Sequence, residues 1–284
     1  MKLLRYGPAG QEKPALLDDK NGIRDLSGVI PDITGQALSP DALDRLQGID
    51  PNTLPLVEGT PRIGPCVSGV SKLVCVGLNY SDHAKETNSE LPGEPILFQK
   101  ATTSIIGPND NVMLPRGSVA TDWEIELGVV IGTKAQYVSE ERALDFVAGY
   151  CIVNDVSERD YQNKRWGQWT KGKSCDTFAP IGPWLVTKDE IPDPQNLDMA
   201  LDVSGKRRQT GNTKTMVFGV AKLVSYISEF MTLLPGDIIP TGTPPGVGQG
   251  HKPPVYLRAG DTMRVRIEKL GEQNQRVVAY EDRR

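Results

Sequence analysis

Short apolar runs separated by turn-forming residues predict a fold built mainly from strands. Runs with the composition of strands cover residues 72–77, 123–131, 150–156, 185–187, 197–203, 237–240, 263–268 and 276–280. In the seventh run, apolar Met263, Val265 and Ile267 alternate with charged residues, which is the period-two pattern of a strand with one buried face. Two further apolar runs, 3–6 and 15–17, lie near the N-terminus.

Helical patterns are fewer. Residues 220–231 place apolar side chains on one face, and residues 140–147 follow Ser139, which we expect to act as an N-cap. A weaker helical stretch covers residues 39–46. Together with 29 Gly and 22 Pro, these patterns predict an α+β fold that is mostly β and rich in loops.

The length of 284 residues favours one large domain with a smaller appendage. The most linker-like segment is 60–65, which is rich in Pro and Gly and precedes the first strong strand pattern. We therefore predict a small N-terminal domain over residues 1–68 and a larger domain over residues 69–284.

Charge and hydropathy limit the classes of partner. The formal net charge is -4 and no basic block is present, so nucleic acid is not an expected partner. No apolar run reaches membrane-spanning length, and the first residues lack the apolar core of a signal peptide, which predicts a cytoplasmic protein with no membrane partner. The four cysteines form no CxxC pair, so we expect reduced thiols rather than a zinc site.

Two carboxylates stand two residues apart in the predicted strand 123–131. Because successive side chains of a strand point to opposite faces, Glu124 and Glu126 share one face and the apolar residues beside them share the other. For an isolated pair of this kind, the solvated face of an edge strand is the favoured interpretation, because most glutamates are exposed. The pair alone is therefore a weak indication of a site.

A third carboxylate, Asp155, comes near the C-terminal end of the predicted strand 150–156. Three carboxylates without nearby Cys or His are the ligand set that a hard cation prefers, and open water positions suit Mg²⁺ or Mn²⁺ better than Zn²⁺. For Asp155 by itself, a helix N-cap or a turn is the alternative.

One of the two histidines is a candidate base. If the segment from residue 81 is helical, His83 and Glu86 share a face, and the carboxylate can orient the imidazole. An ordinary exposed pair at the start of a helix has the same spacing. The other histidine, His251, lies in a Pro-rich loop and is expected to be an ordinary loop residue.

Residues 167–174 match the phosphate-loop pattern GxxxxGKS letter for letter. That motif requires a preceding apolar strand and a following helix, whereas polar residues precede this segment and two prolines soon follow. We therefore do not predict a nucleotide site, although Lys173 could reach a metal-bound anion. The segment 240–248 combines Gly with hydroxyl side chains, which allows backbone amides to approach a carboxylate but also suits a plain turn.

The segments GLNYSDHAKE, DWEIELG, NDVSERDYQ, GKSCDTFAPIGPW and TGTPPGVG, in this order, resemble the fumarylacetoacetate hydrolase family. The resemblance covers the chain from about residue 70 to the end, and the leading region is similar to the small N-terminal domain of some bacterial members. It implies a mixed β-roll, a sandwich of layered sheets with few helices, that assembles as a homodimer.

The resemblance also implies roles for individual residues. The family's metal carboxylates fall on Glu124, Glu126 and Asp155, its catalytic residues on His83, Glu86 and Lys173, and its substrate-contacting residues on Arg159, Gln162 and Thr243. Many members have Phe where this chain has Cys175, which places a smaller side chain near the lysine. The implied cofactor is Mg²⁺ or Mn²⁺.

The activity implied by the resemblance is metal-dependent hydrolysis of the C–C bond between carbons 3 and 4 of a 2,4-dioxo acid. We expect an acylpyruvate, a 2,4-diketo-3-deoxy sugar acid in particular, to give pyruvate and a carboxylic acid. Ureidoglycolate lyase, 2-oxo acid isomerase and decarboxylase are alternatives that use similar metal chemistry. A non-catalytic acid-binding protein is the alternative from another class.

Overall fold

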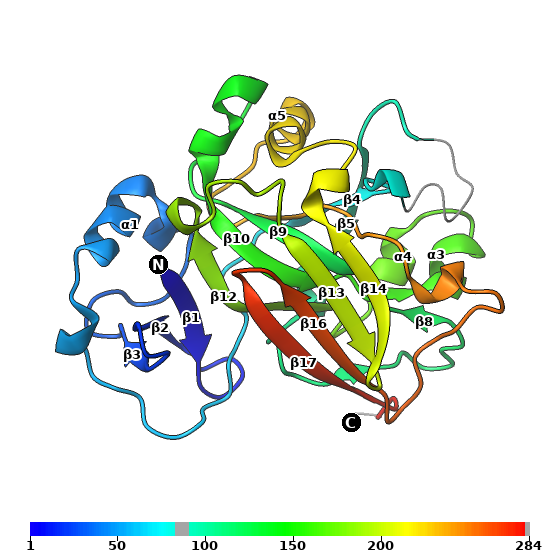
Figure 1. The fold of residues 1–284 in the computed structure, drawn as a ribbon, viewed down its shortest axis with the longest axis horizontal. Helices are drawn as coiled ribbons and strands as arrows, with labels where there is room; N and C mark the ends of the chain where they lie inside the picture. Colours follow the sequence, from blue (N-terminus) through cyan, green and yellow to red (C-terminus); the bar gives the residue numbers. More distant parts are fainter. Residues whose placement is uncertain (83–90, 282–284) are drawn as a thin grey trace.

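A computed structural model describes residues 1–82 and 91–281 (Figure 1). Its largest sheet joins strands from both halves of the chain in the order β3-β2-β1-β12-β10-β9-β15-β4-β5, and β6 also pairs with β12. The strands are β1 (Lys2–Tyr6), β2 (Lys13–Leu17), β3 (Ile23–Asp25), β4 (Leu73–Gly77), β5 (Ile96–Lys100), β6 (Ile105–Ile106), β9 (Ile125–Ile131), β10 (Val147–Asn154), β12 (Ala179–Thr187) and β15 (Ile238–Pro240).

A second sheet has the order β14-β13-β16-β17-β7 and lies across the front of β9, β10 and β12 in Figure 1. It contains β7 (Val112–Met113), β13 (Asp198–Val203), β14 (Lys206–Asn212), β16 (Thr262–Ile267) and β17 (Gly271–Val278), while β8 (Thr121–Asp122) pairs separately with β11 (Ser157–Glu158). The α-helices of the described residues are α1 (Pro40–Gln47), α3 (Arg159–Asn163), α4 (Thr170–Lys173) and α5 (Val220–Phe230). The predicted fold class, mostly β with layered mixed sheets, is confirmed.

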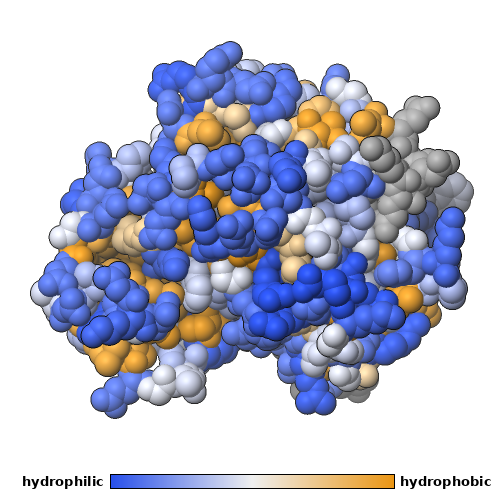
Figure 2. All heavy atoms as spheres, viewed as in Figure 1, coloured by the Kyte–Doolittle hydropathy of each residue, from blue (hydrophilic) through white to orange (hydrophobic). Residues whose placement is uncertain are grey.

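Each face of the large sheet covers its own hydrophobic core. In β4, Val74 and Val76 belong to the core that β9, β13, β16 and α5 share. The alternate residues Leu73 and Cys75 belong to a second core, which includes residues of the N-terminal region. Because both faces are buried, this strand is apolar at every position rather than alternating. On the face shown in Figure 2, hydrophilic side chains cover most of the surface between smaller hydrophobic patches.

The N-terminal region is attached to the large sheet through strand pairing. Leu3 of β1 lies opposite Leu185 of β12, so the first strands extend the sheet that carries β9 and β10. The domain boundary at residue 68 stays a prediction. Within the part of the chain that the structure describes, no helix is both long enough and apolar enough to cross a bilayer.

Most predicted elements are present, with one helix type corrected. The segment predicted as a helix over 140–147 is a 3₁₀ helix, Glu140–Phe146, and the side chain of Ser139 makes no capping hydrogen bond. Val147 already begins β10, which leaves the segment fewer than two α-helical turns. Strand β14 was not predicted because its sequence, KRRQTGN, is polar, and it lies at the edge of its sheet.

Candidate metal centre

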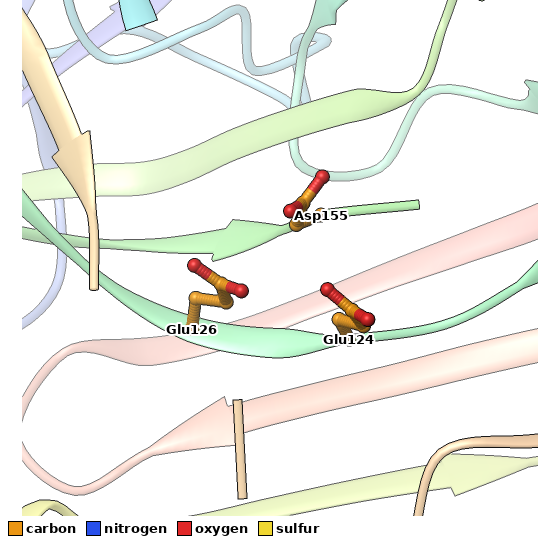
Figure 3. A group of neighbouring side chains, drawn as sticks. All are labelled: Glu124, Glu126 and Asp155. Atoms are coloured by element: carbon orange, nitrogen blue, oxygen red, sulfur yellow. The ribbon is translucent and has the colours of Figure 1, made fainter. Parts of the chain in front are cut away.

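The three predicted metal carboxylates meet where β9 and β10 run side by side. These strands are antiparallel, with Ile125 opposite Asn154. One residue further, the backbone N–H of Asp155 donates to the carbonyl oxygen of Glu124 at 2.8 Å. The strand register therefore brings residues 31 positions apart together, and Figure 3 shows the side chains of Glu124, Glu126 and Asp155 converging.

The carboxylates form a buried cluster. One oxygen from each of Glu124, Glu126 and Asp155 can be chosen so that all three lie within 4.8 Å of one another. Relative exposure is 7% for Glu124, 1% for Glu126 and 0% for Asp155. The solvated strand face, which was the alternative interpretation of the glutamates, is therefore excluded. Isolated charges are costly to bury, so this cluster requires compensating cations.

Two buried lysines supply part of that compensation. Nζ of Lys173 donates to Glu124 Oε2 and to Asp155 Oδ2, at 2.6 Å each. Nζ of Lys100 donates to Asp155 Oδ1 at 2.6 Å and to the carbonyl oxygen of Val156 at 3.0 Å. Both oxygens of Asp155 are thus paired with an ammonium group.

Lys173 owes its position to a close approach between two short helices. A Cβ at Gly172 in α4 would lie 2.5 Å from the carbonyl oxygen of Glu158 and 2.6 Å from the backbone nitrogen of Gln162 in α3. A larger residue would force α4 away from α3. The glycine of the GKS sequence is therefore explained by this packing. As expected from the sequence, the segment does not have the strand–loop–helix structure of a phosphate loop: α4 has four residues, and the element before it is the helix α3.

Arg159 connects the cluster to a second buried acid. Its Nη2 donates to Glu124 Oε1 at 2.5 Å, its Nε to Asp122 Oδ2 at 2.9 Å, and its Nη1 to Gln162 Oε1 at 2.9 Å. Nε2 of Gln162 makes no hydrogen bond within the described residues, although the side chain is 5% exposed. This amide is an available donor beside the carboxylates.

The glutamates differ in their ionisation. Burial acts to raise the pKa of Glu124, but the charges of Arg159 and Lys173 outweigh it and lower the pKa to about 2. Glu126 has no ion-pair partner among the described residues, and burial, together with repulsion from Asp155 and Glu124, holds its pKa well above the usual range. Burial acts to lower the pKa of Lys173, but Asp155 and Glu124 outweigh it and raise the pKa.

The Gly-rich segment after β15 contacts the cluster through its backbone. Gly242 N donates to Glu126 Oε2 at 2.9 Å, and its φ of +96° is a backbone conformation that favours glycine. The amide thus reaches a carboxylate of the protein itself. The hydroxyl of Thr243 donates to the carbonyl oxygen of Ile125 at 2.8 Å and accepts from Gln209 at 2.8 Å, so its single proton is already used.

A cavity of about 500 Å³ lies against this cluster, and Asp155 is not among the residues that line it. Of the residues predicted for the site, its wall contains Glu124, Glu126, Arg159, Gln162, Lys173 and Thr243. The predicted base His83 and its partner Glu86 lie outside the described residues.

Three residues at or around the cavity were not singled out from the sequence. Lys100 ends a five-residue strand, and Asp122 is the first residue of the DWEIELG segment, but the local sequence pattern does not show that either side chain is buried against the cluster. His251 was expected to be an ordinary loop residue, yet its side chain lines the cavity. Only the packing of distant segments brings these residues to the site.

The comparisons with known proteins decide the family. The model named fumarylacetoacetate (FAA) hydrolase C-terminal matches residues 72–278. The chain belongs to the fumarylacetoacetate hydrolase family. A protein of Burkholderia orbicola, named provisionally as a hydrolase, is 64% identical over 277 residues, which cover 97% of this chain and 98% of the relative.

Solved structures of the family superimpose over nearly the whole chain. Fumarylacetoacetate hydrolase from Exiguobacterium antarcticum has a TM-score of 0.86 at 35% identity. A 2-hydroxyhepta-2,4-diene-1,7-dioate isomerase from Mycobacterium marinum has a TM-score of 0.76 at 34% identity. Maleylpyruvate hydrolase from Sphingobium sp. SYK-6 has a TM-score of 0.82 at 28% identity. Each match covers 99% of this chain and 100% of the other. Members of the fumarylacetoacetate hydrolase family are enzymes, with hydrolases and isomerases among them.

Enzymes of the fumarylacetoacetate hydrolase family typically use a divalent metal ion, and the cluster suits one. Its ligand atoms are all carboxylate oxygens, which are ligands for a hard cation. Glu126 offers the clearest indication, because it is buried beside two other acids without an ion-pair partner among the described residues. A cation between the three carboxylates would compensate that charge.

We predict that Lys100→Met destabilises the metal-free protein, because Asp155 stays buried with one of its two ammonium partners removed. In EDTA, the free energy of unfolding from urea denaturation should fall by roughly 3 kcal/mol. Lys222→Met is the control, because the Lys222 side chain is only partly buried and its ion pair with Glu140 is long, at 3.9 Å. A loss no larger than that of the control would show that Lys100 does not stabilise the cluster.

Proposed function

We propose that this protein is a divalent-metal-dependent hydrolase of 2,4-dioxo acids that releases pyruvate. The buried carboxylate cluster, in direct contact with Lys173 at the wall of the cavity, carries the proposal. A cation held by Glu124, Glu126 and Asp155 suits an acid whose 1-carboxylate and 2-oxo oxygens lie side by side. The named substrate of one family neighbour, maleylpyruvate, is an acylpyruvate of this kind. Within this class we favour a 2,4-diketo-3-deoxy sugar acid.

The residues of the chain divide the chemistry between charge stabilisation and positioning. When bound, Mg²⁺ or Mn²⁺ supplies Lewis-acid polarisation of the 2-oxo group. Lys173 provides a positive charge beside the same group, where negative charge develops as the C–C bond breaks. Arg159 fixes Glu124 and Gln162, and Nε2 of Gln162, which makes no hydrogen bond within the described residues, can donate to the substrate. The carboxylate-binding role predicted for Thr243 requires its hydroxyl to leave the carbonyl oxygen of Ile125.

The water step is assigned to His83 and Glu86. In the proposal, His83 takes a proton from a water molecule, which attacks the 4-carbonyl, and Glu86 orients the imidazole. The bond between carbons 3 and 4 then breaks, its electron pair passes into the pyruvate enolate, and carbon 3 takes up a proton. Pyruvate and a carboxylic acid are the products, so atoms and charges balance.

Other reactions use the same kind of site. Isomerisation is supported by the similarity to the 2-hydroxyhepta-2,4-diene-1,7-dioate isomerase. Ureidoglycolate lyase and oxo acid decarboxylase are further alternatives, because the substrates of both have a carboxylate and an adjacent oxygen that a metal can bind. A protein that binds the acid without turnover would need the cluster but no base. The positive charge of Lys173 suits the enolate that hydrolysis, isomerisation and decarboxylation share, and we favour the hydrolase because a hydrolase of an acylpyruvate, maleylpyruvate hydrolase, is among the family neighbours.

We predict metal-dependent release of pyruvate from acylpyruvates and 2,4-diketo-3-deoxy sugar acids in a coupled assay. EDTA should abolish the activity and Mg²⁺ or Mn²⁺ should restore it. Glu126→Gln should weaken metal binding about 10- to 100-fold in calorimetry, because a charged ligand becomes neutral. Glu58→Gln, at an exposed loop position, is the control.

The assay is run beside glyoxylate detection with ureidoglycolate. Release of glyoxylate from ureidoglycolate, with no release of pyruvate from the 2,4-dioxo acids, would show that the protein is a lyase and not the proposed hydrolase. Full pyruvate release in EDTA would contradict the metal-dependent mechanism.

A separate prediction distinguishes catalysis from binding. His83→Ala should leave the affinity for Mn²⁺ within about threefold of that of the unchanged protein, while pyruvate release falls by at least about 100-fold, because the proposed base is lost. Metal affinity is measured by calorimetry and turnover by the coupled assay. Unchanged turnover would remove His83 from the mechanism.

A further inference from the structure

One wall of the cavity is a loop outside the metal cluster. Residues 247–254 follow the Gly-rich segment and contribute Val247, Gln249, Gly250, His251, Lys252 and Pro254 to the lining. The predicted metal and catalytic residues all come from other segments. None of the side chains of this loop has an assigned role in the proposed chemistry.

The loop is fixed to the cluster through a buried acid. Asp122 accepts from Gly248 N at 2.6 Å and from Gln249 N at 3.0 Å, and the same carboxylate accepts from Arg159. Nε1 of Trp123 donates to the carbonyl oxygen of Gly246 at 3.1 Å. Since Arg159 also binds Glu124, the loop and the carboxylates are held by one hydrogen-bonded network. The wall thus has a defined position relative to the metal centre.

His251 stands out among the side chains of this wall. Its ring lies 6.4 Å from the ring of Trp123, centroid to centroid. Its Nε2 is buried and has no hydrogen-bond partner in the described structure. Among the described residues that line the cavity, it is the one whose buried side-chain nitrogen or oxygen lacks a partner. Buried polar groups are nearly always paired, so an unpaired one in a pocket wall indicates a bond that a ligand completes.

The size of the cavity leaves room for such a ligand group. Its volume is about 500 Å³. At roughly 30 Å³ for each water-sized group, the six heavy atoms of a pyruvate unit would occupy less than half of it. The remainder is available to the acyl part of the substrate, and His251 belongs to the wall of this same cavity.

We infer that His251 determines specificity by hydrogen bonding to an oxygen on the acyl chain of the substrate. The inference rests on the proposed hydrolase function and narrows it to acylpyruvates whose acyl chain carries a hydroxyl or carboxylate group. An alkyl chain would leave Nε2 unpaired, and a site that leaves a buried polar group unpaired discriminates against that substrate.

The test compares three acylpyruvates as substrates of the Mg²⁺-loaded enzyme. They are 2,4-dioxohexanoate with an alkyl chain, 5-hydroxy-2,4-dioxopentanoate with a hydroxyl, and 2,4-dioxohexanedioate with a carboxylate. The unchanged protein should prefer at least one oxygenated substrate to the alkyl one by about 10- to 100-fold in kcat/KM. The hydroxyl and carboxylate arms show which oxygen is recognised.

His251→Phe should remove this preference while kcat/KM for the alkyl substrate stays within about threefold, because only the hydrogen bond is lost. His251→Gln retains a polar group and should restore part of the preference. Tyr256→Phe, two residues beyond this loop and outside the cavity lining, should leave the preference unchanged. An equal loss on all three substrates, or a preference that survives in His251→Phe, would overturn the inference.

Binding of the same three acids, measured by calorimetry with Mg²⁺, separates this inference from the proposed function. If no acid releases pyruvate, the hydrolase proposal fails, and the affinities still decide the role of His251. Tighter binding of an oxygenated acid that is lost in His251→Phe supports the role. Equal affinities for the three acids in the unchanged protein contradict it.

Discussion

The site depends on the burial of three carboxyl groups within a few ångströms of one another. Glu124, Glu126 and Asp155 are almost entirely removed from water, and such an arrangement is stable only if cations surround it. The chain provides Lys100, Lys173 and Arg159 for this purpose. Glu126 is left without an ion-pair partner among the described residues, so the protein's own charges leave a place for a further cation.

The strands explain how these charges are held together. Neighbouring antiparallel strands fix the backbone of Glu124 against that of Asp155 by hydrogen bonding. The large sheet is buried on both faces, and its two cores hold β9 and β10 rigidly. Sites built on strands are more precisely positioned than sites built on loops. The loop carrying His251 gains comparable order from the bonds of its backbone to Asp122.

The sequence predicted the parts of the site that follow from local periodicity. The spacing of Glu124 and Glu126 placed both on one face of a strand, and the structure confirms that they converge with Asp155. Periodicity cannot show whether that face is exposed, because burial here depends on pairing with β10 and on Lys173, which α4 brings against the carboxylates. The order of the motifs along the chain, rather than any single motif, carried the family resemblance that the comparisons confirmed.

Residues that act through distant segments were not predictable. Lys100 reaches Asp155 across 55 positions of sequence, and Asp122 meets the loop amides across more than 120. The role of His251 depends on a missing hydrogen bond, which only a packed structure can reveal. The polar edge strand β14 was not predicted for a related reason. Its strand conformation depends on pairing with β13 and not on a hydrophobic pattern in its own sequence.

The central claim is that the three carboxylates bind one divalent cation. Anomalous scattering from crystals grown with Mn²⁺ tests it most directly, because the signal locates the ion independently of activity. We expect a single strong anomalous peak about 2.2 Å from an oxygen of each of Glu124, Glu126 and Asp155. A map with no peak at this cluster, or with Mn²⁺ bound elsewhere in the cavity, would contradict the account.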